Sequence, residues 1–83
     1  VMDGSDSEQV AWYETSSYAR DYRTMLLITD GQYYDLTERL NTSVFYATVK
    51  IIERFNLRAV PSVVYQADKY MHVKEININE ISQ

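Results

Sequence analysis

The chain's single proline, Pro61, constrains the fold most, because it directly precedes a short strand-forming run over 62–66. Proline has no amide hydrogen to donate to a sheet, and it is tolerated at the first residue of a strand. A peptide bond that precedes proline is also the only kind that becomes cis at modest cost. We therefore predict a strand that begins at Ser62 and a cis bond between Val60 and Pro61.

Hydrophobic spacing and capping residues predict an alternation of helices and strands along the rest of the chain. Ser5 and Glu8 have the spacing of a capping box, so we expect a helix to begin near Ser5. Thr48 can cap a second, short helix, and Asn56 tolerates the left-handed conformation that ends it. The predicted elements are a helix over 5–19, a central strand over 24–29, a helix over 33–41, a strand over 43–47, the short helix after Thr48, and strands over 62–66 and 70–76 joined by a turn over 67–69.

These elements predict an α/β domain with a mixed sheet and flanking helices. Two strands joined by a helix must be parallel, whereas the short turn makes the last two strands antiparallel. Imperfect alternation over 70–76 indicates an edge strand, and the segment 76–81 stays open between strand and helix. A helix end, a Val-Pro step and an apolar strand are the arrangement of thioredoxin-like folds, where a cis-proline loop faces the binding groove. We therefore predict a thioredoxin-like fold.

The size and composition indicate one domain over 1–83. A hydrophobic fraction of 46% is enough for a packed core, but eight tyrosines exceed what so small a core needs. Some of them either contact a partner or lie half-buried at the margins of the sheet and helices. The beginning of the chain, 1–4, resembles the end of a strand that enters a turn, so we expect 1–83 to be a fragment of a longer protein.

The charge and the residue types that are absent exclude several functions. A net charge of −4 without a basic cluster argues against nucleic-acid binding. The lack of cysteine excludes disulfides, thiol catalysis and iron–sulfur clusters. No stretch is apolar for long enough to span a membrane, and no signal peptide is present in this segment. We expect no cofactor.

The candidate binding site is the groove that a thioredoxin-like fold places beside its cis-proline. In thioredoxin-like enzymes, a Cys-x-x-Cys pair follows the first core strand. We assign that loop to Asp30, Gly31 and Gln32, which carry no thiol and can also be read as a simple turn into a helix. The backbone of Val60, next to Pro61, could pair with an extended peptide across the groove from this loop. The alternative is a groove that other segments of the protein fill, or one that stays empty.

No other group of residues predicts catalysis or metal binding. His72 is the only histidine, and it falls on the predicted edge strand without further ligands for a metal. Asp3 and Asp6 resemble part of a calcium loop but lack the distal glutamate. A serine nucleophile would have to use His72 as its base, without a residue to orient it. The sequence therefore predicts a protein that is not an enzyme.

Five segments in order resemble the C-terminal domain of TraW, a family of pilus-assembly proteins of F-type conjugative type IV secretion systems. The resembling segments are 3–12, 27–31, 44–45, 54–66 and 73–76. The Val-Pro step by itself is also found in the TrbC family of the same systems. The combination of Asp3-Gly4, Gln9-Val10 and Trp12 favours TraW.

The resemblance implies a non-catalytic, structural role in pilus assembly through contacts between proteins. It further implies a periplasmic location, a preceding N-terminal region with a signal peptide, and association with a TrbC-like partner and other proteins of the conjugation apparatus. The residues by themselves leave an alternative open, namely a cysteine-free peptide-binding or chaperone-like module, including a TrbC-like protein, that uses the groove beside Val60 and Pro61.

Overall fold

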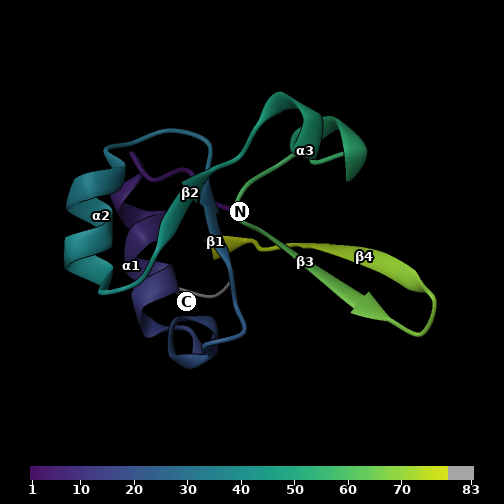
Figure 1. Ribbon diagram of the computed structural model, residues 1–83, viewed down its shortest axis with the longest axis horizontal. Helices are drawn as coiled ribbons and strands as arrows, with labels where there is room; N and C mark the ends of the chain where they lie inside the picture. Colours follow the sequence, from purple (N-terminus) through teal and green to yellow (C-terminus); the bar gives the residue numbers. More distant parts are fainter. Residues whose placement is uncertain (79–83) are drawn as a thin grey trace.

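Helices and two small sheets alternate along the chain in the computed structural model, which describes residues 1–78 (Figure 1). The elements are α1 (Ser7–Thr15), the 3₁₀ helix η1 (Ser17–Arg20), β1 (Leu26–Ile28), α2 (Tyr33–Leu40), β2 (Val44–Tyr46), α3 (Val49–Arg54), β3 (Ser62–Ala67) and β4 (Tyr70–Glu75). This order confirms a small mixed α/β domain. Residues 79–81 of the segment 76–81, which the sequence left open, lie outside the described residues.

The strand pairing follows the predicted connections. β1 and β2 are parallel, with Leu26 opposite Val44, because α2 carries the chain back between them. β3 and β4 are antiparallel, and Ala67 pairs with Tyr70. The turn between them is therefore one residue shorter than predicted. The peptide bond between Val60 and Pro61 is cis, as the sequence predicted.

The first two residues join the two sheets. The amide of Met2 donates a hydrogen bond of 2.9 Å to the carbonyl of Leu27, and the amide of Thr29 donates one of 2.9 Å to the carbonyl of Met2. On the other side, Val1 and Ser62 exchange both of their backbone hydrogen bonds, at 2.7 and 2.8 Å. The spatial order is therefore β2, β1, the segment 1–2, β3 and β4.

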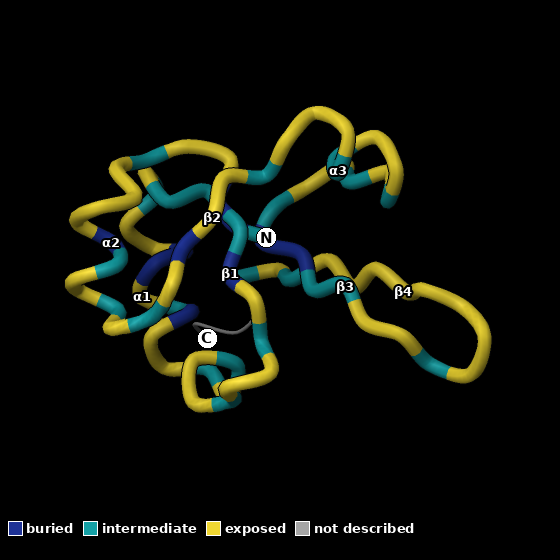
Figure 2. The backbone as a smooth tube through the Cα atoms, viewed as in Figure 1, coloured by how far each residue is buried: buried dark blue, intermediate teal, exposed yellow. Residues whose placement is uncertain are grey.

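The core lies on one face of this arrangement, between the sheet and the helices α1 and α2. Its buried apolar residues are Met2, Val10, Tyr13, Leu26, Ile28, Leu36 and Val44. Trp12 is partly buried and packs against this core. Figure 2 shows the buried backbone gathered around α1, β1 and the beginning of β3, while the hairpin of β3 and β4 extends away from it. All residues of β4 are exposed, which agrees with an edge strand.

The first helix is shorter than the predicted span of 5–19. α1 ends at Thr15, and Ser16 has an extended conformation with ψ of 159° before η1 begins. The hydroxyl of Ser16 donates a hydrogen bond of 2.7 Å to the carbonyl of Tyr13, and that of Thr15 donates one of 3.1 Å to the carbonyl of Trp12. Consecutive hydroxyl side chains thus offer the backbone an alternative to further helical bonds.

Two further local signals agree with the sequence. The side chain of Thr48 accepts a hydrogen bond from the amide of Ile51 and caps α3. Asn56 has a φ of 52°, the left-handed conformation expected after that helix. Within residues 1–78, the helices are too short to cross a membrane.

Met2 should be the most sensitive of the three methionines, because its side chain is 1% exposed at the junction of the sheets. We expect Met2→Ala to lower the free energy of unfolding by about 2–5 kcal/mol, through lost burial and an internal cavity. Met71→Ala on the exposed strand β4 is the matched control and should change it by less than about 0.5 kcal/mol. Urea denaturation measures both, and equal losses would contradict the central place of Met2.

Candidate functional site

A groove of about 400 Å³ lies beside the cis bond that precedes Pro61. Three segments that are distant in the sequence line it: the beginning of α1, the loop before β3 and the chain after β4. The lining residues are Asp6, Glu8, Ala59, Val60, Pro61, Glu75, Ile76, Asn77 and Ile78.

Backbone hydrogen bonds bring these three segments together. Because Ser62 pairs with Val1, the loop before β3 lies next to the chain that leads from Met2 into α1. The amide of Ile76 donates a hydrogen bond of 2.9 Å to the carbonyl of Pro61, which holds the end of β4 against the same loop. The hydroxyl of Ser62, which is buried, donates a short hydrogen bond to the carbonyl of Ala59. The groove is thus a consequence of how the strands pair.

Asp6, and not Ser5, caps the helix that borders the groove. The carboxylate of Asp6 accepts hydrogen bonds from the amide of Glu8 at 3.0 Å and from the side chain of Gln9 at 3.2 Å. The predicted cap, Ser5, is occupied elsewhere, since its amide and hydroxyl both donate to the carboxylate of Asp3, at 2.9 and 2.6 Å. A turn closed by Asp3 therefore shifts the beginning of the helix by one residue.

The buried side chain of Gln9 fixes the shape of this loop. Its carbonyl oxygen accepts a hydrogen bond of 2.7 Å from the amide of Asp3, while its amide group donates to Asp6. Gln9 is 7% exposed, and both ends of its side chain have partners. A buried polar group that is satisfied in this way holds its neighbours in one arrangement.

The sequence placed Val60 and Pro61 on one side of the groove and the loop 30–32 on the other side. The structure does not bring these two groups together. Val60 and Pro61 line the groove, but Asp30, Gly31 and Gln32 do not. Asp30 and Gly31 lie against Gly4 instead: a Cβ on Gly4 would be 2.6 Å from the carbonyl oxygen of Asp30, and one on Gly31 would be 2.7 Å from the carbonyl carbon of Gly4. Gly31 also has a φ of 110°, so glycine suits this close contact both sterically and conformationally.

The segment that faces the cis-proline is the loop 3–6 with the first turn of α1, because the strand between β1 and β3 is the segment 1–2. Sequence reasoning took β1 for the first core strand and so assigned the facing loop to 30–32. The signal that could have found the correct loop was the beginning of the chain, where a short apolar pair precedes Asp3-Gly4 as a strand precedes a turn.

The groove has an acidic rim and an unpaired piece of backbone. Asp6, Glu8 and Glu75 contribute carboxylates, and its lining includes neither lysine nor arginine. In the described part of the chain, neither the amide nor the carbonyl of Val60 makes a hydrogen bond. Such groups can pair with the backbone of an extended segment, and the carboxylates favour a positively charged one.

A second candidate surface is a cluster of exposed aromatic residues on α2 and β2. The ring centre of Tyr33 lies 4.6 Å from that of Tyr34 and 5.8 Å from that of Tyr46. The hydroxyl of Tyr46 donates a hydrogen bond of 2.9 Å to the carbonyl of Gly31, and hydrogen bonding with Tyr34 raises the pKa of Tyr33. Tyr34 is 70% exposed. We call Tyr33, Tyr34 and Tyr46 the tyrosine cluster.

The burial of the eight tyrosines bears on whether some of them contact a partner or lie half-buried at the margins of the sheet and helices. The position of His72 bears on metal binding. Only Tyr13 belongs to the buried core, and Tyr18 packs against it. The others are exposed: Tyr22, Tyr33, Tyr34, Tyr46, Tyr65 and Tyr70. His72 stacks on Tyr65 with ring centres 5.3 Å apart, on the exposed strand β4. Across residues 1–78, histidine and carboxylate side chains form no group of three that could hold a metal ion.

Replacing the cap should separate the observed beginning of α1 from the predicted one. We expect Asp6→Ala to lower the free energy of unfolding by about 1–2 kcal/mol, because the amide of Glu8 and the side chain of Gln9 lose their acceptor. Ser5→Ala removes only exposed hydrogen bonds and should cost less than about 0.5 kcal/mol. Urea denaturation decides the matter, and a larger loss for Ser5→Ala would restore Ser5 as the cap.

No protein-family model, no curated protein and no solved structure matches this chain. The groove, the tyrosine cluster and the residues of the sequence therefore carry the functional proposal.

Proposed function

We propose that this chain is a non-catalytic, thioredoxin-like domain that acts through protein contacts as an assembly component of an F-type conjugative type IV secretion system. The observation that carries the proposal is the loop that faces the cis-proline. Thioredoxin-like enzymes place their reactive cysteines at this loop, where the beginning of a helix stabilises a thiolate. This chain has Asp3-Gly4-Ser5-Asp6 there and no cysteine at any position. Thiol–disulfide exchange is therefore impossible for it, and binding is the function that remains for the groove.

The arrangement of the strands supports the thioredoxin-like part of the proposal. With the segment 1–2 as the first core strand and α1 as the helix that follows, the loop at Asp3 occupies the position of the usual cysteine pair. A parallel strand on one side, an antiparallel hairpin on the other and a cis bond before Pro61 complete this arrangement. The strand directions depend on backbone pairing and the cis bond depends on Pro61, so none of these features requires a catalytic residue.

The role in conjugation is supported by the resemblance to the TraW C-terminal domain, and the structure adds one point to it. Two of the resembling segments, 3–12 and 54–66, are distant in the sequence yet meet at the groove through Asp6, Glu8 and Val60. A shared binding or assembly surface would require such a meeting. The proposal places the domain in the periplasm with a TrbC-like protein as a partner.

The tyrosine cluster is the surface that best fits a protein partner. Aromatic side chains are enriched at interfaces, because they bury a large area at a small cost in side-chain entropy. Tyr33, Tyr34 and Tyr46 are held against one another and against Gly31, so little order has to be gained on binding.

We expect Tyr34→Ser to weaken co-purification with a TrbC-like partner and to raise the Kd by about tenfold or more, as for an aromatic hot spot. Tyr22→Ser is the matched control, because Tyr22 is 96% exposed and lies outside the cluster, so its Kd should be unchanged. Titration calorimetry measures both. Equal Kd values for Tyr34→Ser and the unmodified chain would remove the cluster from the interface, and normal pili in cells that lack the domain would overturn the role in assembly.

A second candidate function, peptide binding in the groove, is favoured by the unpaired backbone of Val60 between acidic side chains. A segment that pairs with Val60 would gain main-chain hydrogen bonds, and lysine or arginine side chains on it would approach Glu8 and Glu75. This mode needs no thiol, which agrees with the composition.

We expect a short extended peptide rich in lysine and valine to shift the amide resonance of Val60, while an acidic peptide of the same length does not. Glu75→Lys should weaken the binding about two- to fivefold, since an exposed charge pair contributes about 0.2–1 kcal/mol. Glu38→Lys on α2 changes the net charge equally but lies outside the groove, so it should have a smaller effect. Shifts confined to other amides, or equal losses in both variants, would refute this use of the groove.

A further inference from the structure

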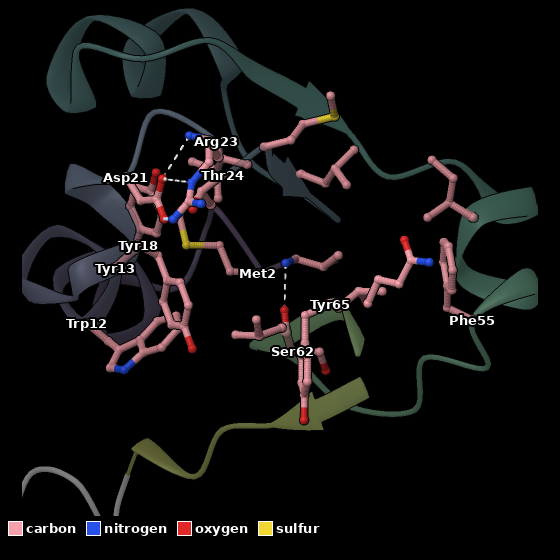
Figure 3. A pocket seen from close by; sticks show the side chains of 18 residues that line it. Met2, Trp12, Tyr13, Tyr18, Asp21, Arg23, Thr24, Phe55, Ser62 and Tyr65 are labelled. Atoms are coloured by element: carbon pink, nitrogen blue, oxygen red, sulfur yellow. Dashed lines mark hydrogen bonds and ion pairs between the residues drawn. The ribbon is translucent and has the colours of Figure 1, made fainter. Parts of the chain in front are cut away.

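A large cleft separates β1 from β3 beyond the two residues that join them. Its volume is about 940 Å³, and residues of both strands line it, namely Leu26 and Leu27 of β1 and 62–66 of β3. Trp12, Tyr13 and Tyr18 line it on one side, and Phe55 lines it on the opposite side (Figure 3). Ile51 of α3, the helix that precedes Phe55, also lines it. Both walls are therefore largely apolar and aromatic.

The edges that face this cleft carry backbone groups without a strand to pair with. The amide and the carbonyl of one residue point to the same edge of a strand. The carbonyl of Leu27 accepts a hydrogen bond from Met2, so the amide of Leu27 also points to this edge. The amide and carbonyl of Ser62 both bond to Val1. Because every second residue of a strand points its backbone groups to the same edge, the amide and carbonyl of Val64 face the cleft. In residues 1–78, β1 pairs only with β2 and Met2, and β3 pairs only with β4 and Val1.

The two edges have the correct directions for one shared strand. Met2 pairs with Ile28 in parallel, and Val1 pairs with Ser62 in the antiparallel manner. A strand that continues these ladders backward from Val1 would pass Leu26 on one side and Val63 on the other. About four residues would reach Gln66, the last residue of β3 that lines the cleft.

The walls define the side chains that such a strand would carry. Alternate side chains would point toward Trp12 and Tyr18 on the face of Met2, and toward Ile51 and Phe55 on the other face. A strand that is covered on both faces is apolar along its whole length. The charged side chains that line the cleft, Asp21 and Arg23, are already paired with each other at 3.1 Å and require no charged partner.

We propose that this cleft holds an extended, apolar segment of about four residues that is joined to Val1 and completes one continuous sheet from β2 to β4. Continuity with the existing ladders favours a joined segment over a separate peptide. A separate peptide in this register would have to end against the nitrogen of Val1, which already donates to Ser62 at 2.7 Å. A joined segment meets no such obstacle.

The test compares the chain with versions that carry a four-residue extension before Val1, followed by amide hydrogen exchange. The sequence Val-Ile-Val-Val should slow the exchange of the amides of Leu27 and Val64 by about tenfold or more, because both become paired within a sheet. The matched control Val-Ile-Pro-Val places proline where an amide should bond to Val64, and it should lose most of this protection.

Three outcomes would overturn the proposal. The first is unchanged exchange at Leu27 and Val64 with the apolar extension. The second is equal protection from a polar extension of the same length, Ser-Asp-Gly-Ser, which would show that the cleft does not select an apolar strand. The third is full protection by the capped tetrapeptide Val-Ile-Val-Val added as a separate molecule, which would assign the cleft to a partner's strand instead of a joined one.

Discussion

The rest of the structure depends on the backbone pairing of Val1 and Met2 with both neighbouring strands. Met2 bonds to Leu27 and Thr29, and Val1 exchanges two bonds with Ser62. Without these bonds, the parallel pair of β1 and β2 and the hairpin of β3 and β4 are separate two-stranded sheets, which are marginal by themselves. The same residues anchor the core, because the side chain of Met2 is fully buried against α1 and β1.

The groove and the cleft both follow from this junction. Toward α1, the chain leaves the junction through Asp3 and Gly4 and brings the capped end of the helix beside Pro61, which forms the acidic groove. In the opposite direction the junction ends at Val1, and β1 and β3 diverge around the large cleft. Within residues 1–78, the groove presents the unpaired backbone of Val60, whereas the cleft presents two strand edges. A short contact with a partner suits the first feature, and a complete strand suits the second.

Signals that act within a few residues were sufficient to predict much of the fold. The cap at Thr48, the left-handed Asn56 and the cis bond before Pro61 depend on local conformational preferences, and all three are confirmed. The pairing directions also followed, because a helical connection imposes parallel strands and a tight turn imposes antiparallel ones. Val60 and Pro61 were placed in a groove for the same reason, since the proline marks the beginning of β3.

Only the tertiary structure decided which segment lies at the centre of the sheet and which loop faces Pro61. Val1 and Met2 are too few to show the periodicity of a strand, so the sequence placed Asp30 to Gln32 at the groove. Only long-range hydrogen bonds put the loop after Met2 there. The choice of Asp6 over Ser5 as the cap likewise depends on the buried Gln9. The sequence by itself determined the types and order of most elements, because local propensities govern them. Their neighbours in space depended on pairing between residues as distant as Val1 and Ser62, which no local pattern encodes.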